Sequence, residues 1–253
     1  MSPLEAVLVT LAGVAAGTIN TVVGSGTLIT FPTLLAFGVP PVTANVSNTV
    51  GLVPGSMSGA FGYRRELAGQ RGRVLRLGSA SLLGGIAGAL LLLWLPTSAF
   101  DAIVPALIAL GVLLVVLGPR IQRSVAARAE SRGGIPDHGV WWVWPAVAAA
   151  GIYGGYFGAA QGVLLMAILG IGVADSMQRH TATKNVLALL VNAVAAAVFV
   201  AVADIDWAVA GLIAVGSVIG GQIGAGVGRR LPPTLLRAVI AAVGVVALVV
   251  LLV

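Results

Sequence analysis

The stretch "NTVVGSGTLITFPTLL", from Asn20 to Leu35, decides how this chain is folded. A long apolar run stops at Gly24, Ser25 and Gly26, starts again, and soon meets Pro32. A simple membrane anchor has no use for this interruption, because glycine and proline both weaken a helix interior. The stretch therefore predicts two helices joined at a break, and the break calls for a functional explanation.

The composition is that of an integral membrane protein. Of the 253 residues, 58% are hydrophobic and 9% are charged, and the mean hydropathy is +1.06, which is far from the values of soluble domains. The net charge of +6 comes from basic residues between apolar stretches, so we attribute it to membrane orientation. The absence of cysteine excludes disulfides and thiolate metal sites. We expect the lipid bilayer as a partner, no nucleic acid, no metal and no cofactor.

The apolar stretches predict an all-α fold that crosses the bilayer several times. A helix needs roughly 20 apolar residues to cross a hydrocarbon core of about 30 Å. Two stretches are longer than one span and contain glycine breaks: Pro3 to Phe37 and Val140 to Gly172. Others have the length of one span: Val42 to Gly62, Val74 to Leu95, Ala99 to Leu117, Val186 to Ala203, Trp207 to Gly228 and Leu235 to Val253. In all, we expect about 8 to 10 hydrophobic segments.

The two halves of the chain repeat each other. "LGSASLLGGIAGAL" (77–90) matches "VGSVIGGQIGAGVG" (215–228) in its glycines, and Gly24 and Gly38 pair with Gly158 and Gly172. The offset is about 135 residues. We therefore divide the chain into a first membrane repeat at 1–118, a basic linker at 119–139 and a second membrane repeat at 140–253.

Loop charges predict that the two repeats are inverted. Residues 63–76 carry five Arg against one Glu, and 119–139 carry four Arg, so both segments should be cytoplasmic in a prokaryotic inner membrane. In the second half, the acidic Asp204 and Asp206 stand where the first half has its Arg-rich loop. Inversion requires an odd number of crossings in each half, and each half has three single-span stretches after its opening stretch. Each opening stretch must therefore cross an even number of times, either as two short spans or as a hairpin that re-enters from one side.

The glycine breaks predict a transport site. Backbone that leaves helical geometry inside a membrane needs protein or a cavity to satisfy its polar groups. Paired broken helices in inverted repeats are typical of secondary transporters, which bind substrate near the midplane. Helices restarting at about Thr27 and about Val163 would direct free N–H groups at an anion. The second break is "GAAQG", with Gly158, Gln161 and Gly162. The alternative is that these glycines only permit close hairpin packing.

A polar cluster follows each hairpin: "TANVSNT" (43–49) and "RHTATKN" (179–185). These residues either cap a helix or line a pore, and they extend further than one cap requires. We take as candidate lining residues Asn48, Thr49, Thr183, Lys184 and Asn185.

Lys184 is the one lysine of the chain. An ionisable group inside a membrane segment is a functional hypothesis by default, and this one could neutralise an approaching anion. It could equally extend to the cytoplasmic face as an anchor. The neighbouring His180 could titrate near neutral pH, but a lone histidine at a loop edge is more often a polar surface residue, and we expect that role here.

A glycine stripe at i, i+4 spacing runs along the third span of the second half: Gly216, Gly220, Gly224 and Gly228. Small residues on one helix face let another helix approach closely. We expect packing within the bundle, and a homodimer face is the less favoured use.

At this point the sequence resembles the TauE/SafE family of sulfite exporters, also grouped as 4-toluene sulfonate uptake permeases. The resemblance rests on the duplicated order of glycine, broken hairpin, proline or small-residue loop and polar segment in "GTINTVVGSGTLITFPTLLAFGVPPVTANVSNTV" and "GIYGGYFGAAQGVLLMAILGIGVADSMQRHTATKNV", and it covers nearly the whole chain. It implies passage of sulfur-containing or related organic anions, by export or uptake. Carried over by position, it implies roles for Gly24, Ser25, Gly26, Asn48, Gly158, Gln161, Gly162 and Lys184. The second tip departs from the pattern, since Ala159 and Ala160 stand where glycines are frequent.

Two other classes of function fit the sequence less well than transport. A membrane enzyme would need clusters of His and acidic residues inside the spans, and the sequence has none, so we expect no catalytic residues. A scaffold subunit would have no need for duplicated helix breaks. No carboxylate sits inside a span to relay protons, which leaves facilitated flux, or a substrate that carries its own proton, both open. A permease for another small organic anion also remains an alternative.

Overall fold

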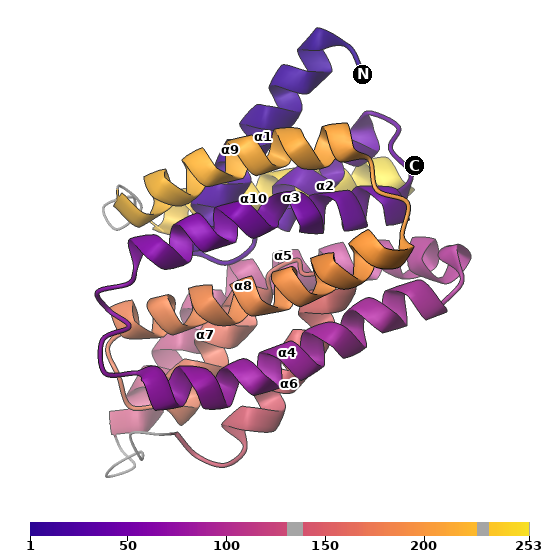
Figure 1. Cartoon of the computed structure of the whole chain (residues 1–253). Coiled ribbons are helices and arrows are strands. Elements are labelled where there is room, and N and C mark those ends of the chain that lie inside the picture. Colours follow the sequence, from indigo (N-terminus) through magenta and orange to yellow (C-terminus); the bar gives the residue numbers. More distant parts are fainter. Residues whose placement is uncertain (131–138, 227–232, 253) are drawn as a thin grey trace.

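The computed structural model describes residues 1–130, 139–226 and 233–252, and within these ranges every regular element is a helix (Figure 1). The all-α prediction is confirmed. The described helices are α1 (Pro3–Val22), α2 (Thr27–Ala36), α3 (Pro41–Gly62), α4 (Arg71–Trp94), α5 (Thr97–Glu130), α6 (Val143–Tyr156), α7 (Gln161–Gly172), α8 (Met177–Val202), α9 (Trp207–Gly226) and α10 (Pro233–Leu252).

Both opening stretches are broken where the glycines predict it. The first break lies between α1 and α2, and Gly24 adopts a φ of 90° there. The second lies between α6 and α7, where Gly158 has a φ of 78° and Ala160 a φ of 62°. Only glycine adopts such angles without strain. Because Ala160 turns the chain, α7 starts at Gln161, two residues earlier than the sequence suggested.

The first helix of each half packs into the other half. α1 lies along α9, and α6 lies along α4. These pairs approach closely because glycines face the neighbouring backbone: a Cβ on Gly220 would lie 2.1 Å from the Val14 carbonyl oxygen, and one on Gly88 would lie 2.1 Å from that of Ile152. The prediction that the glycine stripe serves packing inside the bundle is therefore confirmed for its described members, and Gly228 lies outside the described residues.

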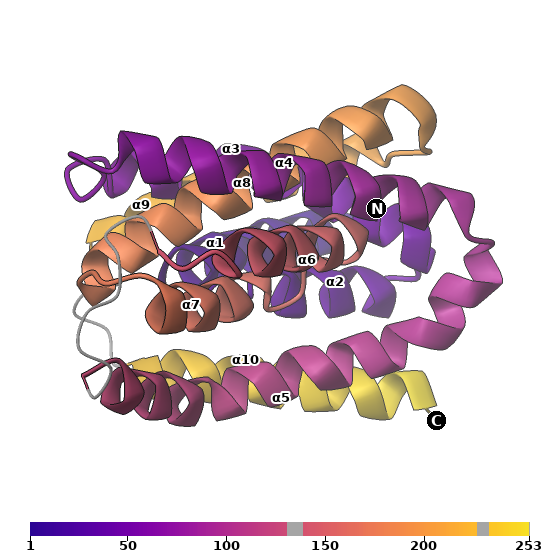
Figure 2. The same cartoon turned by 90° about the horizontal axis from the view of Figure 1, so that it is seen from below.

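The matched helices α3 and α8 pack against each other and run antiparallel (Figures 1 and 2). At one end, the Asp206 N–H after α8 donates to Ser47 near the start of α3 at 2.9 Å. At the other end, Tyr63 after α3 packs with Ala182 near the start of α8. This packing is compatible with inverted repeats, and the inversion across a membrane stays a prediction.

Five of the described helices are long and apolar enough to cross a membrane: α1, α4, α8, α9 and the part of α5 from Thr97 to Arg120. α5 itself continues to Glu130, so the first part of the expected linker at 119–139 is helical. α5 packs along α10 at one edge of the bundle (Figure 2). This extension was not predicted, because an Arg-rich segment can end a membrane span without ending the helix.

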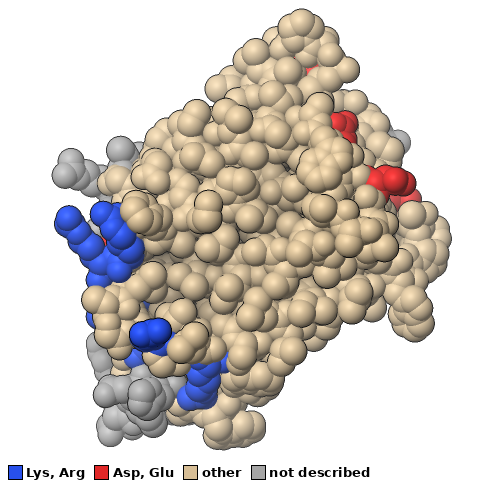
Figure 3. Space-filling view, viewed as in Figure 1, with Lys and Arg blue, Asp and Glu red and all other residues tan. Residues whose placement is uncertain are grey.

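On one face of the molecule, most of the visible charged side chains lie at its two ends (Figure 3). On the face in Figure 3, basic side chains gather at the end where α3 leads into α4, and acidic ones lie toward the opposite end. The broad middle of this face carries neither kind. Such a distribution suits a bundle whose two ends meet water and whose middle meets lipid.

Candidate functional site

The two helix breaks touch each other inside the bundle. The Gly162 N–H donates to the Gly24 carbonyl at 2.9 Å. A Cβ on Gly24 would lie 2.3 Å from the Gly162 Cα, and one on Gly162 would lie 2.4 Å from the Gly24 Cα. This approach is possible only because both residues are glycine. The structure thus brings together two candidate residues that stand far apart in the sequence.

Unused backbone donors surround this contact. The first N–H groups of a helix have no partner within it. At the start of α2, the N–H groups of Ser25, Gly26 and Thr27 have no acceptor in the described residues. The same is true of Ala159 and Ala160 before α7. Both breaks therefore present positive dipole ends to the same region.

Two polar side chains at the breaks are buried without hydrogen-bond partners. They are the Ser25 hydroxyl and the Gln161 amide nitrogen, and both residues are at least 96% buried, with exposures of 0% and 4%. The Gln161 amide lies against Gly154 of the same hairpin, where a Cβ would be 2.3 Å from its Cδ. A buried polar group left unpaired costs about 1–3 kcal/mol, so this cost at both breaks points to a ligand.

Asn48 orders the start of α2. Its side-chain oxygen accepts a hydrogen bond from Thr30, and its amide nitrogen lies 3.3 Å from the Thr27 hydroxyl, to which it donates. The N-cap position of α3 belongs to Pro40 and that of α8 to Ser176. The alternative that the two polar clusters cap these helices is therefore wrong for Asn48 and Lys184.

A polar side chain from each half holds the end of the broken helix in the other half. Lys184 Nζ donates to the carbonyls of Asn20 at 2.9 Å and Thr21 at 3.0 Å, at the end of α1. The Asn45 amide donates to the Tyr156 carbonyl at 2.9 Å, at the end of α6. Lys184 is fully buried, so the anchor alternative, with its ammonium at the membrane surface, is wrong. Asn45 was not a candidate, although it lies in the polar cluster that the sequence analysis singled out.

The remaining candidates lie around these contacts. The Asn185 amide nitrogen is buried without a partner, and the Thr49 hydroxyl donates to the Asn45 carbonyl one turn back. Thr183 differs, because its hydroxyl donates to Gln70 before α4 at 2.9 Å. It therefore belongs to the contacts at the basic end of the bundle and not to the breaks.

A further polar cluster lies beside Lys184, and it was not predicted from the sequence. The amides of Asn20 and Asn192 both donate to the Ser56 hydroxyl, at 3.4 Å and 3.2 Å. These residues come from α1, α8 and α3. Single Asn and Ser residues within apolar spans were the available signal, but nothing in the sequence places them together.

At the basic end, an ion network joins the two halves. The Asp175 carboxylate, between α7 and α8, accepts from Arg73 of α4 and from Arg179 of α8. Burial alone would raise the pKa of the Asp175 carboxyl, but hydrogen bonds from Arg73 and Arg179 outweigh it and hold that pKa below its usual range. His180 in the next turn is only 6% exposed and its Nε2 contacts the Val173 carbonyl, so the expectation of a surface histidine is wrong.

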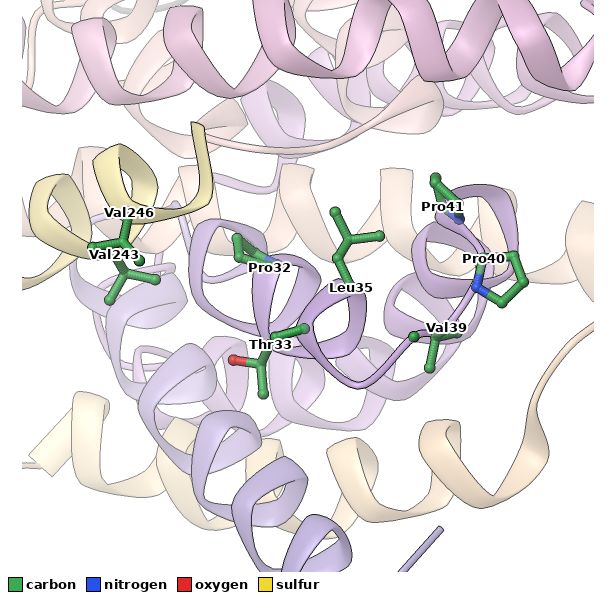
Figure 4. A pocket seen from close by; sticks show the side chains of 10 residues that line it. Pro32, Thr33, Leu35, Val39, Pro40, Pro41, Val243 and Val246 are labelled. Carbon is green, nitrogen blue, oxygen red and sulfur yellow. The ribbon is translucent and has the colours of Figure 1, made fainter. Parts of the chain in front are cut away.

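The pocket in Figure 4 lies apart from the breaks. Its volume is about 550 Å³, and it is lined by the end of α2, the turn into α3 and two valines of α10, Val243 and Val246. Its lining is apolar except for the Thr33 hydroxyl. With no cation and few donors, this pocket has little to offer an anion.

Comparison with known proteins places the chain in a family. Its residues 9–251 match the family described as "Sulfite exporter TauE/SafE". The chain belongs to this family. "Probable membrane transporter protein YfcA" of Escherichia coli K12 is 25% identical, over 88% of this chain and 81% of that protein. "Probable membrane transporter protein ORF9" of Sinorhizobium is 28% identical, over 85% of this chain and 79% of its own. A "Probable membrane transporter protein" of Haemophilus influenzae is 24% identical, over 89% and 86%.

No solved structure matches the chain. Membership in the TauE/SafE family, together with the long apolar helices, makes this protein a multi-pass membrane transporter. It also confirms the family to which the duplicated hairpins pointed.

Proposed function

We propose that this protein carries a sulfur-containing oxyanion, such as sulfite, thiosulfate or an organosulfonate, across a prokaryotic inner membrane. The observation that carries the proposal is the set of unpaired donors at the two breaks: the N–H groups that start α2 and precede α7, and the buried side chains of Ser25 and Gln161. Donors left unpaired inside a protein indicate a missing acceptor. An oxyanion supplies several acceptors at once.

The chemistry of the surroundings favours an anion over a cation. The helix starts offer positive dipole ends, and Lys184 adds an ionisable side chain at the end of α1. The carboxylate of Asp175 is occupied by two arginines at the basic end of the bundle. A cation would therefore find no counter-charge among the described residues at the breaks.

The contact between Gly24 and Gly162 refines the position that we propose for the anion. The two glycines are too close for a ligand to lie between them, so the anion binds beside their contact, where Ser25 and Gln161 lie. Release to one side then requires the two hairpins to move relative to each other, as in alternating access.

Flux into proteoliposomes tests the proposal. The purified protein is reconstituted and the uptake of sulfite, thiosulfate, sulfate and methanesulfonate is measured. We expect saturable uptake of at least one of them, and at least a tenfold loss with Ser25→Ala, since each tenfold corresponds to about 1.4 kcal/mol. Ser81→Ala is the matched control, because Ser81 of α4 is also fully buried and its hydroxyl also lacks a partner.

The result also separates the alternatives. Uptake of carboxylates without uptake of any sulfur oxyanion would redirect the proposal to another small organic anion. Absence of all uptake by correctly folded protein would contradict transport of these anions and favour a scaffold role. Equal losses in Ser25→Ala and Ser81→Ala would show that the effect comes from folding and not from the site.

A further inference from the structure

Lys184 is a buried amine with no counter-ion among the residues that the structure describes. Its side chain is fully buried in α8, and Nζ contacts two backbone carbonyls, those of Asn20 and Thr21. Asp175 forms ion pairs with Arg73 and Arg179, and neither pair involves Lys184. A buried ammonium with no negative partner is unfavourable, and such a group tends to become neutral.

The helices packed around Lys184 offer no acid to balance it. α8 contacts α1, α3, α4, α6 and α7. α3 and α7 contain no titratable side chain, and the one acid of α1 is Glu5 in its first turn, at the other end of the helix from Asn20. The other titratable groups on these helices are tyrosines, cations and a histidine: Tyr153 and Tyr156 on α6, Arg71, Arg73 and Arg76 on α4, and Arg179 and His180 on α8 itself.

The number of acceptors matches a neutral amine. A neutral lysine amine has two N–H groups and one lone pair, whereas the ammonium has three N–H groups. Nζ has two acceptors, at 2.9 Å and 3.0 Å. A third N–H would therefore have no partner within the described residues. An oxygen of a bound anion would supply both that partner and the missing negative charge.

We propose that Lys184 gains a proton when the anion binds and loses it when the anion leaves, so that the protein moves anion and proton together. This inference rests on the proposed function of the same site. The proton passes from water on the loading side to the Nζ lone pair and returns to water on the other side, and no bond within the anion changes. The proton balances the charge of a monoanion, so that the loaded site is neutral. A lysine thereby performs the coupling for which the sequence showed no carboxylate.

A purely structural role makes different predictions. A cation near the last carbonyls of a helix stabilises that helix end, and Lys184 could do only this for α1. In that case its protonation state would not depend on the anion. Lys184→Arg separates the two roles, because arginine keeps the charge and the donors but does not release a proton.

Calorimetry on the purified protein measures the coupling directly. Thiosulfate and methanesulfonate, which carry no proton of their own near neutral pH, are titrated in two sulfonate-free buffers that differ in heat of ionisation. We expect uptake of up to about one proton per bound anion in the wild type, rising with pH as the free amine becomes neutral. Lys184→Arg should bind the anion with no proton uptake, and Lys184→Met should bind it at least tenfold more weakly.

A second measurement needs no variant. Lys184 is the only lysine in the chain, so protein labelled with ¹⁵N-lysine gives one side-chain signal. We expect the signal of a neutral amine without anion and of an ammonium with it. Anion binding without proton uptake, or an ammonium signal in both states, would overturn the coupling and leave the transport proposal standing. Failure of every anion to bind would overturn both.

Discussion

The N–H of Gly162 and the carbonyl of Gly24 form a 2.9 Å hydrogen bond that joins the broken hairpins of the two halves. The bond is possible because neither residue has a side chain. It makes the two breaks one structural unit, so a change at one glycine should be felt at both hairpins.

Gly162→Ala tests this contact. Its Cβ would meet backbone atoms of Gly24 that cannot move without shifting α2, so we expect a loss of about 1–3 kcal/mol in stability and a loss of anion uptake. Thermal unfolding in detergent and proteoliposome uptake measure the two effects. Gly211→Ala in α9 is the control, because its Cβ meets no atom within 4 Å and should stabilise the helix by up to about 1 kcal/mol. Similar effects of the two substitutions would contradict the contact.

The close packing of α1 on α9 and of α6 on α4 predicts a matched pair of variants. Gly220→Val and Gly88→Val each direct a side chain at a backbone carbonyl of the neighbouring helix. We expect both to lower the melting temperature by similar amounts, since overpacking costs about 1–3 kcal/mol. Gly72→Val, at an open position in the first turn of α4, serves as the control. A large effect from only one of the pair would argue against equivalent roles in the two halves.

The ion network at the basic end predicts a pH dependence of stability. The pKa of Asp175 is held below its usual range in the folded protein by Arg73 and Arg179. The ionised carboxylate therefore stabilises the fold above its unfolded pKa of about 3.9, and this contribution is lost as pH falls through the lower folded value.

Asp175→Asn should remove this contribution, which we expect to be about 1–3 kcal/mol for a partly buried, hydrogen-bonded charge. Melting temperatures measured from pH 7 down to pH 3 provide the test. The difference between wild type and variant should shrink toward the acidic end. A difference that stays constant with pH would show that the carboxylate does not contribute through its charge.

The predicted membrane orientation can be tested because the chain has no cysteine of its own. Ala68→Cys, in the exposed turn between α3 and α4, should be protected from an impermeant maleimide added to intact cells. Ser98→Cys, exposed at the start of α5, should be labelled. Labelling of both after permeabilisation controls for accessibility, and the opposite pattern in intact cells would reverse the assigned sides.

The breaks could be predicted from the sequence because glycine runs inside apolar stretches report directly on local backbone. Their mutual contact could not, since it joins Gly24 to a residue in the other half and depends on how the halves pack. Lys184 illustrates the same limit. Its residue type indicated function. However, a lysine that anchors the helix at the membrane surface and a buried lysine that contacts α1 look the same in the sequence. Only the burial of Lys184 and its contacts with backbone carbonyls distinguish the two roles. Asn45 and Ser56 were overlooked because a lone polar residue in a span shows no partner until the fold is known.

The exchange of first helices between the halves constrains how the chain can be made. α1 ends at Val22, but the helix against which it packs begins only at Trp207. During synthesis we therefore expect α1 to lack its main packing partner until most of the chain has been inserted, and the Thr18 hydroxyl to lack its contact with the Gly220 carbonyl. Neither half contains the main partner of its own first helix, so a half expressed alone would lack its main packing surface. We therefore expect assembly of the core to come late in synthesis, and a chain truncated before α9 to lack the main partner of α1.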